Sequence, residues 1–282
     1  MGIEQPRRPF TDGISIGVLT RIFHRDLVDE VLAETGRRER RSRLLPARVV
    51  VYYVLALCLF YGDAYEEVMR KLVQGLRFLG SWADAWRVPT TSAFSQARQR
   101  LGEEPLAELF HRVARPMAAA GTRGTWYGDW RVMALDGVVL DVPDTPENRE
   151  KFGKSRNAQA ESPFPQVRIV GLAECGTHAI VGAAFDTYRT MERDLASRLL
   201  DEVEPGQLVL ADRGFYSYDF FSAVRTTGAD LLWRVSSTLE LPALEWLPDG
   251  SYRSEVGPNR WKVDAKRGKR RCVPAELLLP VR

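Results

Sequence analysis

Two aspartates stand where the chain could hold a metal ion. Asp136 follows the strand-like run 131–135, and Asp212 follows the strand-like run 208–211. Sheets of α/β proteins present ligand-binding groups at the carboxyl ends of strands, and carboxylate oxygens are ligands that Mg²⁺ prefers. If the two strands are neighbours, the carboxylates converge across a strand spacing of about 4.8 Å. Because the two residues lie far apart in the sequence, only the fold can bring them together.

Each aspartate also has a purely structural interpretation. The pair Asp136-Gly137 is a strong hairpin-turn signal between two strand-like runs, and Asp212 is a candidate N-cap of the following helix. Asp141 and Asp144 are further acids close to the first strand, with a proline between them that favours a turn. The residues alone leave these alternatives open.

The elements that must position the acids fall into two groups. Up to about residue 120, apolar residues recur at helical spacing. From residue 124 on, short β-rich runs appear, and helical segments lie between the later ones, which predicts a mixed sheet. The first group comprises helices at 19–32, 49–61, 64–79, 93–102 and 106–117. The second comprises strands at 132–135, 138–142, 167–172, 179–185, 208–210 and 231–235, with helices at 192–203 and 218–226.

Composition and missing motifs exclude several classes of protein. The 282 residues carry 40 Lys+Arg against 37 Asp+Glu, and the net charge of +3 is too small to indicate a nucleic-acid partner by itself. The sequence has no P-loop, no strand-linked GxGxxG and no HExxH, which argues against nucleotide hydrolysis and zinc peptidase chemistry. The longest apolar run, 49–61, is too short to span a bilayer, so we expect no membrane partner. Three widely spaced cysteines and the lack of a signal peptide favour the cytoplasm.

The distribution of basic residues along the sequence is more informative about nucleic-acid binding than their number. One cluster lies in residues 37–43, a second lies in residues 266–271, and a third group lies on the predicted helix 93–102. Such clusters can neutralise phosphates and release counterions, and the helices at 93–102 and 106–117 suggest a helix-turn-helix-like unit. Solvated loops and an ordinary surface helix are the alternatives. The candidate DNA-binding residues are Arg41, Arg43, Arg98, Arg100, Lys266, Arg267 and Arg270.

Several segments together resemble one family. Residues 135–144 (LDGVVLDVPD) and 210–217 (LADRGFYS) look like the two acidic segments of DDE transposases of the insertion-sequence-four family. Residues 45–50 and 95–102 are similar to the helical N-terminal domain of that family, and residues 165–168 and 172–177 also match its style. The likeness covers nearly the whole chain, and the order and spacing of the segments make it specific.

The resemblance implies an RNase H-like core carrying an Asp-Asp-Glu triad. In such a core the first acid lies on the first strand and the second just after the neighbouring fourth strand, so the resemblance assigns Asp136 and Asp212 as catalytic metal ligands. A complete triad holds two Mg²⁺ or Mn²⁺ ions, one activating water or a DNA 3′-hydroxyl and one stabilising the leaving oxygen. The implied partners are double-stranded DNA, as transposon terminal inverted repeats and target DNA, and a homodimer is an assembly that this interpretation allows.

The resemblance also implies a division of the chain. We expect a helical N-terminal domain over 1–124 that binds DNA ends, an incomplete RNase H-like mixed-sheet core over 125–236, and the start of a β-rich insertion over 237–282. The fold class is therefore mixed, α+β with α/β character.

One part of the family pattern is missing. The third acid should lie in a Y-(2)-R-(3)-E-(6)-K pattern on a later helix, and no glutamate of this sequence satisfies it. Glu255 has the right neighbours at the wrong spacing, and Glu240, Glu245 and Glu276 lack the Tyr, Arg and Lys partners. We therefore expect the chain to stop before the catalytic helix, and its strand-transfer activity to be absent or impaired. The alternatives are a DNA-binding regulator that occupies transposon ends and inhibits the full-length transposase, and a degenerate product without function.

Overall fold

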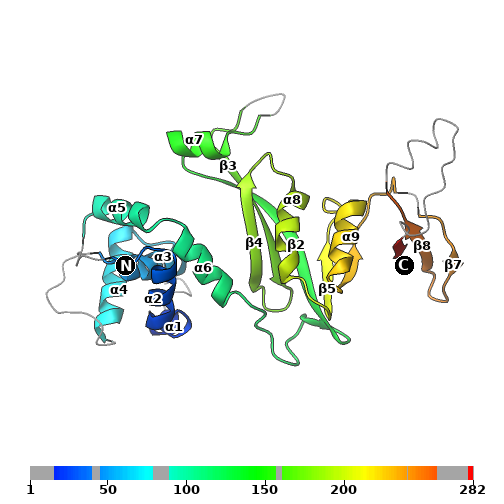
Figure 1. The fold of residues 1–282 in the computed structure, drawn as a ribbon, viewed down its shortest axis with the longest axis horizontal. Helices are drawn as coiled ribbons and strands as arrows, with labels where there is room; N and C mark the ends of the chain where they lie inside the picture. Colours follow the sequence, from blue (N-terminus) through cyan, green and yellow to red (C-terminus); the bar gives the residue numbers. More distant parts are fainter. Residues whose placement is uncertain are drawn as a thin grey trace, which may run out of the picture. The chain divides into compact units, whose positions relative to one another are not determined.

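The computed structural model describes residues 16–39, 45–78, 89–156, 161–239, 241–258 and 279–281 (Figure 1). The chain divides into two compact units, Met1–Val113 and Ala114–Arg282. The first unit is helical, and the second is built on a mixed sheet, so the predicted fold class is confirmed. Among the helices in the described ranges, none has the length and apolar character that crossing a membrane requires.

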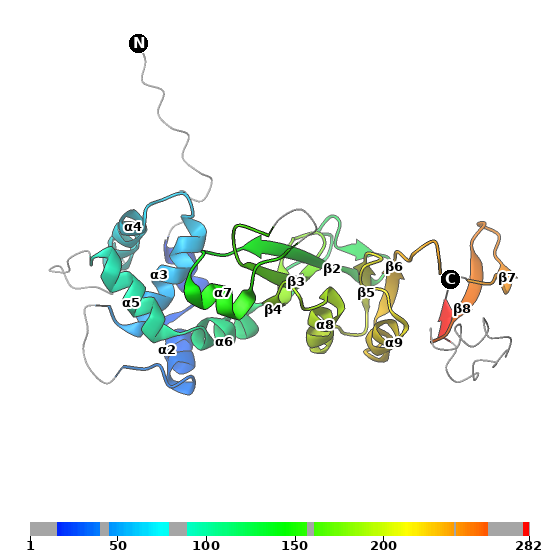
Figure 2. The same cartoon turned by 90° about the horizontal axis from the view of Figure 1, so that it is seen from above.

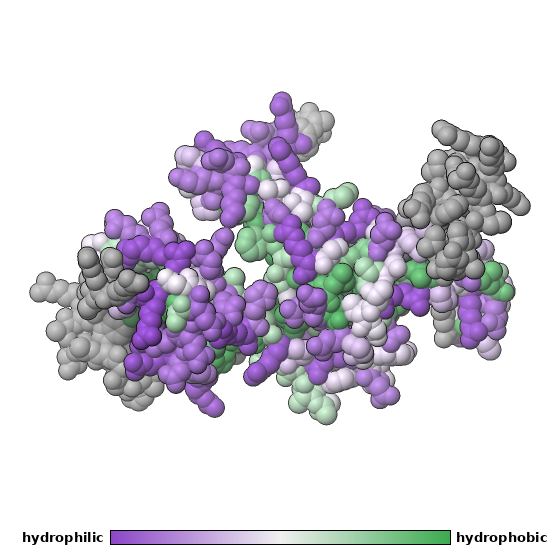
Figure 3. All heavy atoms as spheres, in the orientation of Figure 1, coloured by the Kyte–Doolittle hydropathy of each residue, from purple (hydrophilic) through white to green (hydrophobic). Residues whose placement is uncertain are grey.

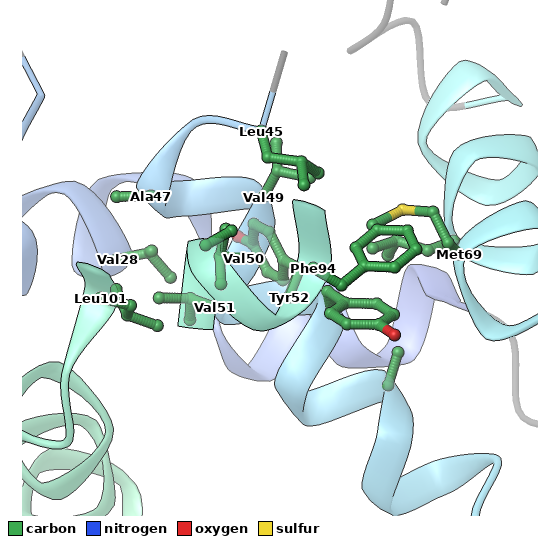
Figure 4. Packing of buried hydrophobic residues seen from close by; sticks show 14 of the residues in the cluster. Val28, Leu45, Ala47, Val49, Val50, Val51, Tyr52, Met69, Phe94 and Leu101 are labelled. Atoms are coloured by element: carbon green, nitrogen blue, oxygen red, sulfur yellow. The ribbon is translucent and has the colours of Figure 1, made fainter. Parts of the chain in front are cut away.

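The helical unit has a core of its own. Its elements are α1 (Ile16–Ile22), α2 (Arg25–Glu34), α3 (Ala47–Leu59), α4 (Tyr65–Phe78), α5 (Thr91–Leu101) and α6 (Glu104–Val113). The central helix is α3, because its sequence is apolar on nearly every side and most of its residues are buried. Phe94 of α5 stacks on Tyr53 of α3, with the ring centroids 4.7 Å apart, and lies beside Met69 of α4 (Figure 4).

The helix predicted over 19–32 is two helices in the structure. α1 ends at Ile22, and α2 begins at Arg25 with His24 as its N-cap. The backbone N–H of Leu27 donates a hydrogen bond to Nδ1 of His24 at 3.2 Å, which satisfies one of the free donors of the first turn. The apolar spacing continues across the break, so periodicity alone could not reveal it.

The described residues of the second unit form two sheets. Its elements are β1 (Trp126–Tyr127), β2 (Trp130–Asp141), α7 (Pro146–Phe152), β3 (Gln166–Glu174), β4 (Ile180–Thr187), α8 (Glu192–Ala196), the 3₁₀ helix η2 (Ser197–Glu202), β5 (Gln207–Ala211), α9 (Tyr218–Thr226), β6 (Asp230–Trp233), β7 (Glu245–Trp246), β8 (Tyr252–Val256) and β9 (Leu279–Val281). The main sheet has the strand order β4-β3-β2-β5-β6, with β1 paired to β2. β2, β3 and β4 form an antiparallel meander, whereas β5 and β6 run parallel to β2. This arrangement is the RNase H-like core that the resemblance implies, with β2 as its first long strand and β5 as its fourth.

The two faces of the main sheet differ. α8 and α9 lie on one side of the strands (Figure 2), and their residues Leu195 and Val224 are buried in one cluster with Met133 and Leu135 of β2. Side chains alternate between faces along a strand, so the residues between these buried positions point to the other side. We call that other side the open face. Its exposed apolar residues are Val138, Leu140, Ile180, Phe185 and Leu232.

The segment after α6 joins the sheet through a buried acid. The side chain of Glu174, at the end of β3, is fully buried. Its carboxylate accepts hydrogen bonds from the backbone N–H groups of Met117 and Ala118 at 3.1 and 2.9 Å. Arg131 of β2 and Thr177 donate to the same carboxylate. Residues 114–124 therefore belong structurally with the sheet.

Candidate active site

Asp136 and Asp212 occupy matching positions on neighbouring strands. β2 and β5 pair in parallel, and Leu135 of β2 lies opposite Ala211 of β5. Asp136 and Asp212 directly follow this pair of residues. We therefore expect their backbones to lie one strand spacing, about 4.8 Å, apart across the sheet.

Both carboxylates point to the open face. Leu135 and Ala211 are buried on the helix-covered face at 4% and 9% exposure. Asp136, the next residue of β2, alternates to the opposite face, and we infer the same direction for Asp212, which directly follows β5. Asp136 is exposed, and the side chain of Asp212 is 63% exposed. Two acids on one face and one strand step apart are placed to share a cation.

The two carboxylates keep most of their oxygen lone pairs free. The backbone N–H of Gly137 donates to Oδ1 of Asp136 at 2.8 Å. Nη1 of Arg234 lies 3.8 Å from Oδ1 of Asp212, and both of these side chains are largely exposed, so this ion pair is weak. Ionised carboxylates with unused lone pairs suit a hard divalent cation. In the described ranges, however, no three His, Cys, Asp or Glu side chains come together as a metal site. The structure thus offers a metal ion two ligands here.

The local alternatives for the two aspartates do not match the structure. Asp136 and Gly137 lie inside β2, which continues to Asp141, and so they form no hairpin turn. The N-cap of α9 is Ser217, whose hydroxyl accepts a hydrogen bond from the N–H of Phe220 at 3.2 Å. Asp212 lies earlier, at the end of β5, and caps no helix.

The other acids of the first acidic segment are engaged elsewhere. Asp141 accepts a hydrogen bond from the side-chain amide of Gln166 at 2.9 Å. Asp144 accepts hydrogen bonds from Arg149 at 2.5 and 2.7 Å and from Lys154 at 3.1 Å. The hydrogen bond from Arg149 is the main reason that the pKa of Asp144 is lowered to about 2. These contacts order the connection between β2 and β3.

Two residues near the aspartates were missed by sequence reasoning. Arg234 directly follows β6 and reaches Asp212, and a basic residue at a strand end beside an acidic one is a signal that could have found it. Glu192, the first residue of α8, lies against Gly137 and Gly214. No sequence motif predicts this contact, because Glu192 packs against glycine backbones from distant segments of the sequence.

The candidate DNA-binding residues of α5 differ in their surroundings. The guanidinium of Arg98 is half-buried and lies over the ring of Tyr65, 5.3 Å from its centroid. Arg100 is exposed, and its side chain takes part in no ion pair within the described part of the chain. The surface over α5 and α6 is mostly hydrophilic in the view of Figure 3. Arg41, Arg43, Lys266, Arg267 and Arg270 lie outside the described residues.

Much of the other basic charge in the helical unit is neutralised. Arg37 forms an ion pair with Glu104 at 3.0 Å. Arg48 pairs with Asp29. Arg112 contacts three acids, namely Glu30, Glu34 and Glu108. Arg100 is therefore better placed than these arginines to meet a phosphate.

Comparison with known proteins identifies the family. Residues 13–111 match the model of the N-terminal region of the insertion element 4 transposase, and residues 128–278 match the model of the transposase DDE domain. The transposase InsG for insertion sequence element IS4 of Escherichia coli strain K12 is 31% identical over 210 residues, which cover 74% of this chain and 46% of InsG. The putative transposase InsZ of the same strain is 28% identical over 195 residues, covering 68% of this chain and 62% of InsZ.

These matches have a defined extent. The chain spans about half of InsG and about three fifths of InsZ. One solved structure that was matched is the piggyBac transposase synaptic complex with hairpin DNA. The alignment covers 87% of this chain and 59% of the piggyBac chain, at 10% identity and a TM-score of 0.42. The DDE-domain model covers more than half of this chain, and the N-terminal model is that of the IS4 transposase. The chain therefore belongs to the IS4 family of DDE transposases.

Proposed function

We propose that this chain carries out metal-dependent DNA cleavage and strand transfer by a DDE mechanism when its acidic site is complete. Asp136 and Asp212 are the proposed metal ligands of this reaction. The observation that carries the proposal is the matching position of these two residues on the open face of neighbouring parallel strands. Three elements support the proposal together: the exposure of both carboxylates, their unused lone pairs and the family match.

The proposed cofactor is Mg²⁺ or Mn²⁺. Both ions accept carboxylate oxygens, and two of them are expected when a third acid completes the site. Bound ions would neutralise the repulsion between the crowded carboxylates. They would also supply activation of the attacking oxygen and stabilisation of the leaving oxygen.

The proposal includes low activity of residues 1–282 on their own. Glu255 lies on strand β8 and Glu245 on strand β7, whereas the family pattern places its glutamate on a helix. Two carboxylates hold two metal ions poorly in catalytic geometry, so we expect little or no strand transfer without a further carboxylate.

The proposed division of labour follows the sequence. Residues 1–124 would bind the terminal inverted repeats, chiefly through Arg98 and Arg100 of α5, and residues 125–236 would hold the metal. Residues 237–282 would be the start of an insertion whose basic residues, Lys266, Arg267 and Arg270, contact DNA. We also propose Arg41 and Arg43 as phosphate contacts, target DNA and a homodimer as partners, and the cytoplasm as the location.

The test is Mn²⁺ binding by isothermal titration calorimetry. We expect saturable binding by the wild-type chain and its loss in Asp136→Asn and in Asp212→Asn. Asp141→Asn is the matched control, because Asp141 lies on the same strand but is bound to Gln166 instead of facing Asp212. Equal Mn²⁺ affinity of all four proteins would refute the assignment of Asp136 and Asp212.

A second function is favoured by the independent core of the helical unit. A chain with little strand-transfer activity can still occupy transposon ends and inhibit the full-length enzyme. The family model of the N-terminal region matches this unit separately, and the described residues of its core cluster all lie between Leu19 and Leu109. A metal-free gel shift on the terminal repeats distinguishes the two functions, because regulation needs specific, salt-dependent binding without any cation. Binding equal to that of unrelated DNA would exclude the regulator.

A further inference from the structure

The acidic residue Glu192 lies close to Asp136 and Asp212 but on the helix-covered face of the sheet. Glu192 is the first residue of α8, and this short helix is packed firmly against the main sheet through Leu195 and Ala196. The next residue, Arg193, donates a hydrogen bond from Nη1 to the carbonyl oxygen of Tyr216 at 3.2 Å. The start of α8 is thereby tied to the loop that follows Asp212.

The carboxylate of Glu192 touches both aspartate-bearing segments. A Cβ atom added to Gly137 would lie 3.0 Å from Oε1 of Glu192 and 3.1 Å from its Cδ. A Cβ atom added to Gly214 would lie 3.4 Å from Oε2 of the same residue. Gly137 directly follows Asp136, and Gly214 lies two residues after Asp212. One side chain therefore lies against β2 at Gly137 and against the loop after Asp212 at Gly214, and the absence of side chains at the two glycines makes room for it.

Among the residues that the structure describes, none forms an ion pair with Glu192. Its carboxylate forms no hydrogen bond and no ion pair with any residue that the structure describes, and it is only half-buried. Asp136 itself accepts the N–H of Gly137, so the carboxylates of Asp136 and Glu192 flank the same residue from opposite faces. A negative charge beside the backbone that carries both aspartates adds to the attraction that the site exerts on a cation.

We propose that Glu192 is a positioning residue of the Asp136–Asp212 site. From the helix-covered face, it holds β2 at Gly137 and the loop after Asp212 in their relative positions. Its charge strengthens cation binding, although it is not a direct ligand. This role rests on the proposed function. It explains why Gly137 follows Asp136 and why Gly214 lies two residues after Asp212, which a metal site made of Asp136 and Asp212 alone does not require.

The first test measures Mn²⁺ affinity in an isosteric variant. Glu192→Gln keeps the shape of the side chain and removes its charge, so we expect Mn²⁺ to bind about 3–10-fold more weakly with an unchanged Tm. Glu202→Gln is the matched control, because the Cγ of Glu202 lies 3.1 Å from a Cβ added to Gly182 of β4, on the same face but away from the aspartates. We expect this control to bind Mn²⁺ like the wild type.

The outcomes separate this role from the proposed function. Wild-type affinity in Glu192→Gln, together with loss of binding in Asp136→Asn, would overturn the role of Glu192 and leave the metal site intact. Unchanged binding in both aspartate variants, or no saturable binding by the wild type, would overturn the proposed function and this role with it.

The second test is a double-mutant cycle for the contact itself. Gly137→Ala places a methyl group against the Glu192 carboxylate and is expected to lower the Tm and weaken Mn²⁺ binding. In the Glu192→Ala background the same change meets no carboxylate, so its effect on the Tm should largely disappear. Equal Tm shifts in the two backgrounds would show that Glu192 does not rest on Gly137.

Discussion

Asp136 and Asp212 occupy equivalent positions on two parallel neighbouring strands, although they come from distant parts of the sequence. Each follows a residue buried on the helix-covered face, and each therefore points to the open face. The parallel register between β2 and β5 is what makes the pair, because a shift of one residue would send one carboxylate to the opposite face. The site thus depends on the pairing of the strands more than on any local motif.

We predict that Glu174 is a stability-determining residue of the second unit. Its buried carboxylate accepts hydrogen bonds from Arg131 and from the backbone of Met117 and Ala118. Removing one partner of a buried charged pair typically costs about 3–5 kcal/mol, so we expect a loss of this size for Glu174→Ala in urea unfolding. Glu174→Gln should lose less, because its amide oxygen can still accept a hydrogen bond.

An exposed acid provides the control for Glu174. Glu245 pairs with Arg253 at 2.9 Å on the surface, where an ion pair contributes about 0–1 kcal/mol. Glu245→Gln should therefore leave the free energy of unfolding almost unchanged. If Glu174→Ala were equally mild, the carboxylate would not hold residues 114–124 to the sheet.

The stability of this unit should also fall in acid. Burial alone would raise the pKa of Glu174, but the hydrogen bonds from Thr177, Met117, Arg131 and Ala118 outweigh it, and the pKa lies below its usual 4.5. A carboxyl with a lowered pKa in the folded state stabilises the protein fully above its unfolded pKa and loses this contribution as the pH falls through the folded value. The acid-induced loss of stability should therefore be smaller in Glu174→Gln than in the wild type.

Asp144 should titrate at unusually low pH. The hydrogen bond from Arg149 is the main cause that lowers the pKa of Asp144 from 3.8 to about 2. In Arg149→Ala we expect the pKa to move back towards 3.8, as measured by carboxyl-carbon chemical shifts in a pH titration. An unshifted Asp144 in the wild type would show that the contact does not persist in solution.

The two arginines of α5 should separate DNA binding from stability. Arg100 is exposed, so we expect Arg100→Ala to weaken binding to the terminal repeats and to reduce the slope of log K against log [salt] by about 1, without lowering the Tm. Arg98 lies over Tyr65, so Arg98→Ala should also lower the Tm, because a cation–π contact of about 0.5–1 kcal/mol is lost. Gln99→Ala, an exposed and uncharged position of the same helix, is the control. A salt slope in Arg100→Ala equal to that of Gln99→Ala would remove Arg100 from the interface.

The sequence predicted most elements but not how they continue or combine. The runs 132–135 and 138–142 are one strand, because Asp136 and Gly137 fit an extended backbone and pair with β3 throughout. The helix expected over 106–117 ends at Val113, shortly before Arg115, whose neighbour Pro116 disfavours a helical residue in front of it. Local patterns report periodicity, and they say little about where an element ends.

The candidate site was predictable only in part. The residue types and strand ends indicated Asp136 and Asp212 as metal ligands, and the family resemblance indicated that their strands are neighbours. Glu192 gave no signal, because its contacts are with glycine backbones that come close only in the folded sheet. A side chain that acts through packing against distant backbone leaves no spacing to recognise.

The central claim is that Asp136 and Asp212 share a divalent cation. The most direct measurement is a crystal structure of the chain soaked in Mn²⁺, with the ion located by its anomalous scattering. We predict a peak within coordination distance, about 2.0–2.3 Å, of a carboxylate oxygen from each aspartate. Carboxylates that turn away from each other, or Mn²⁺ bound only at other residues, would contradict the account.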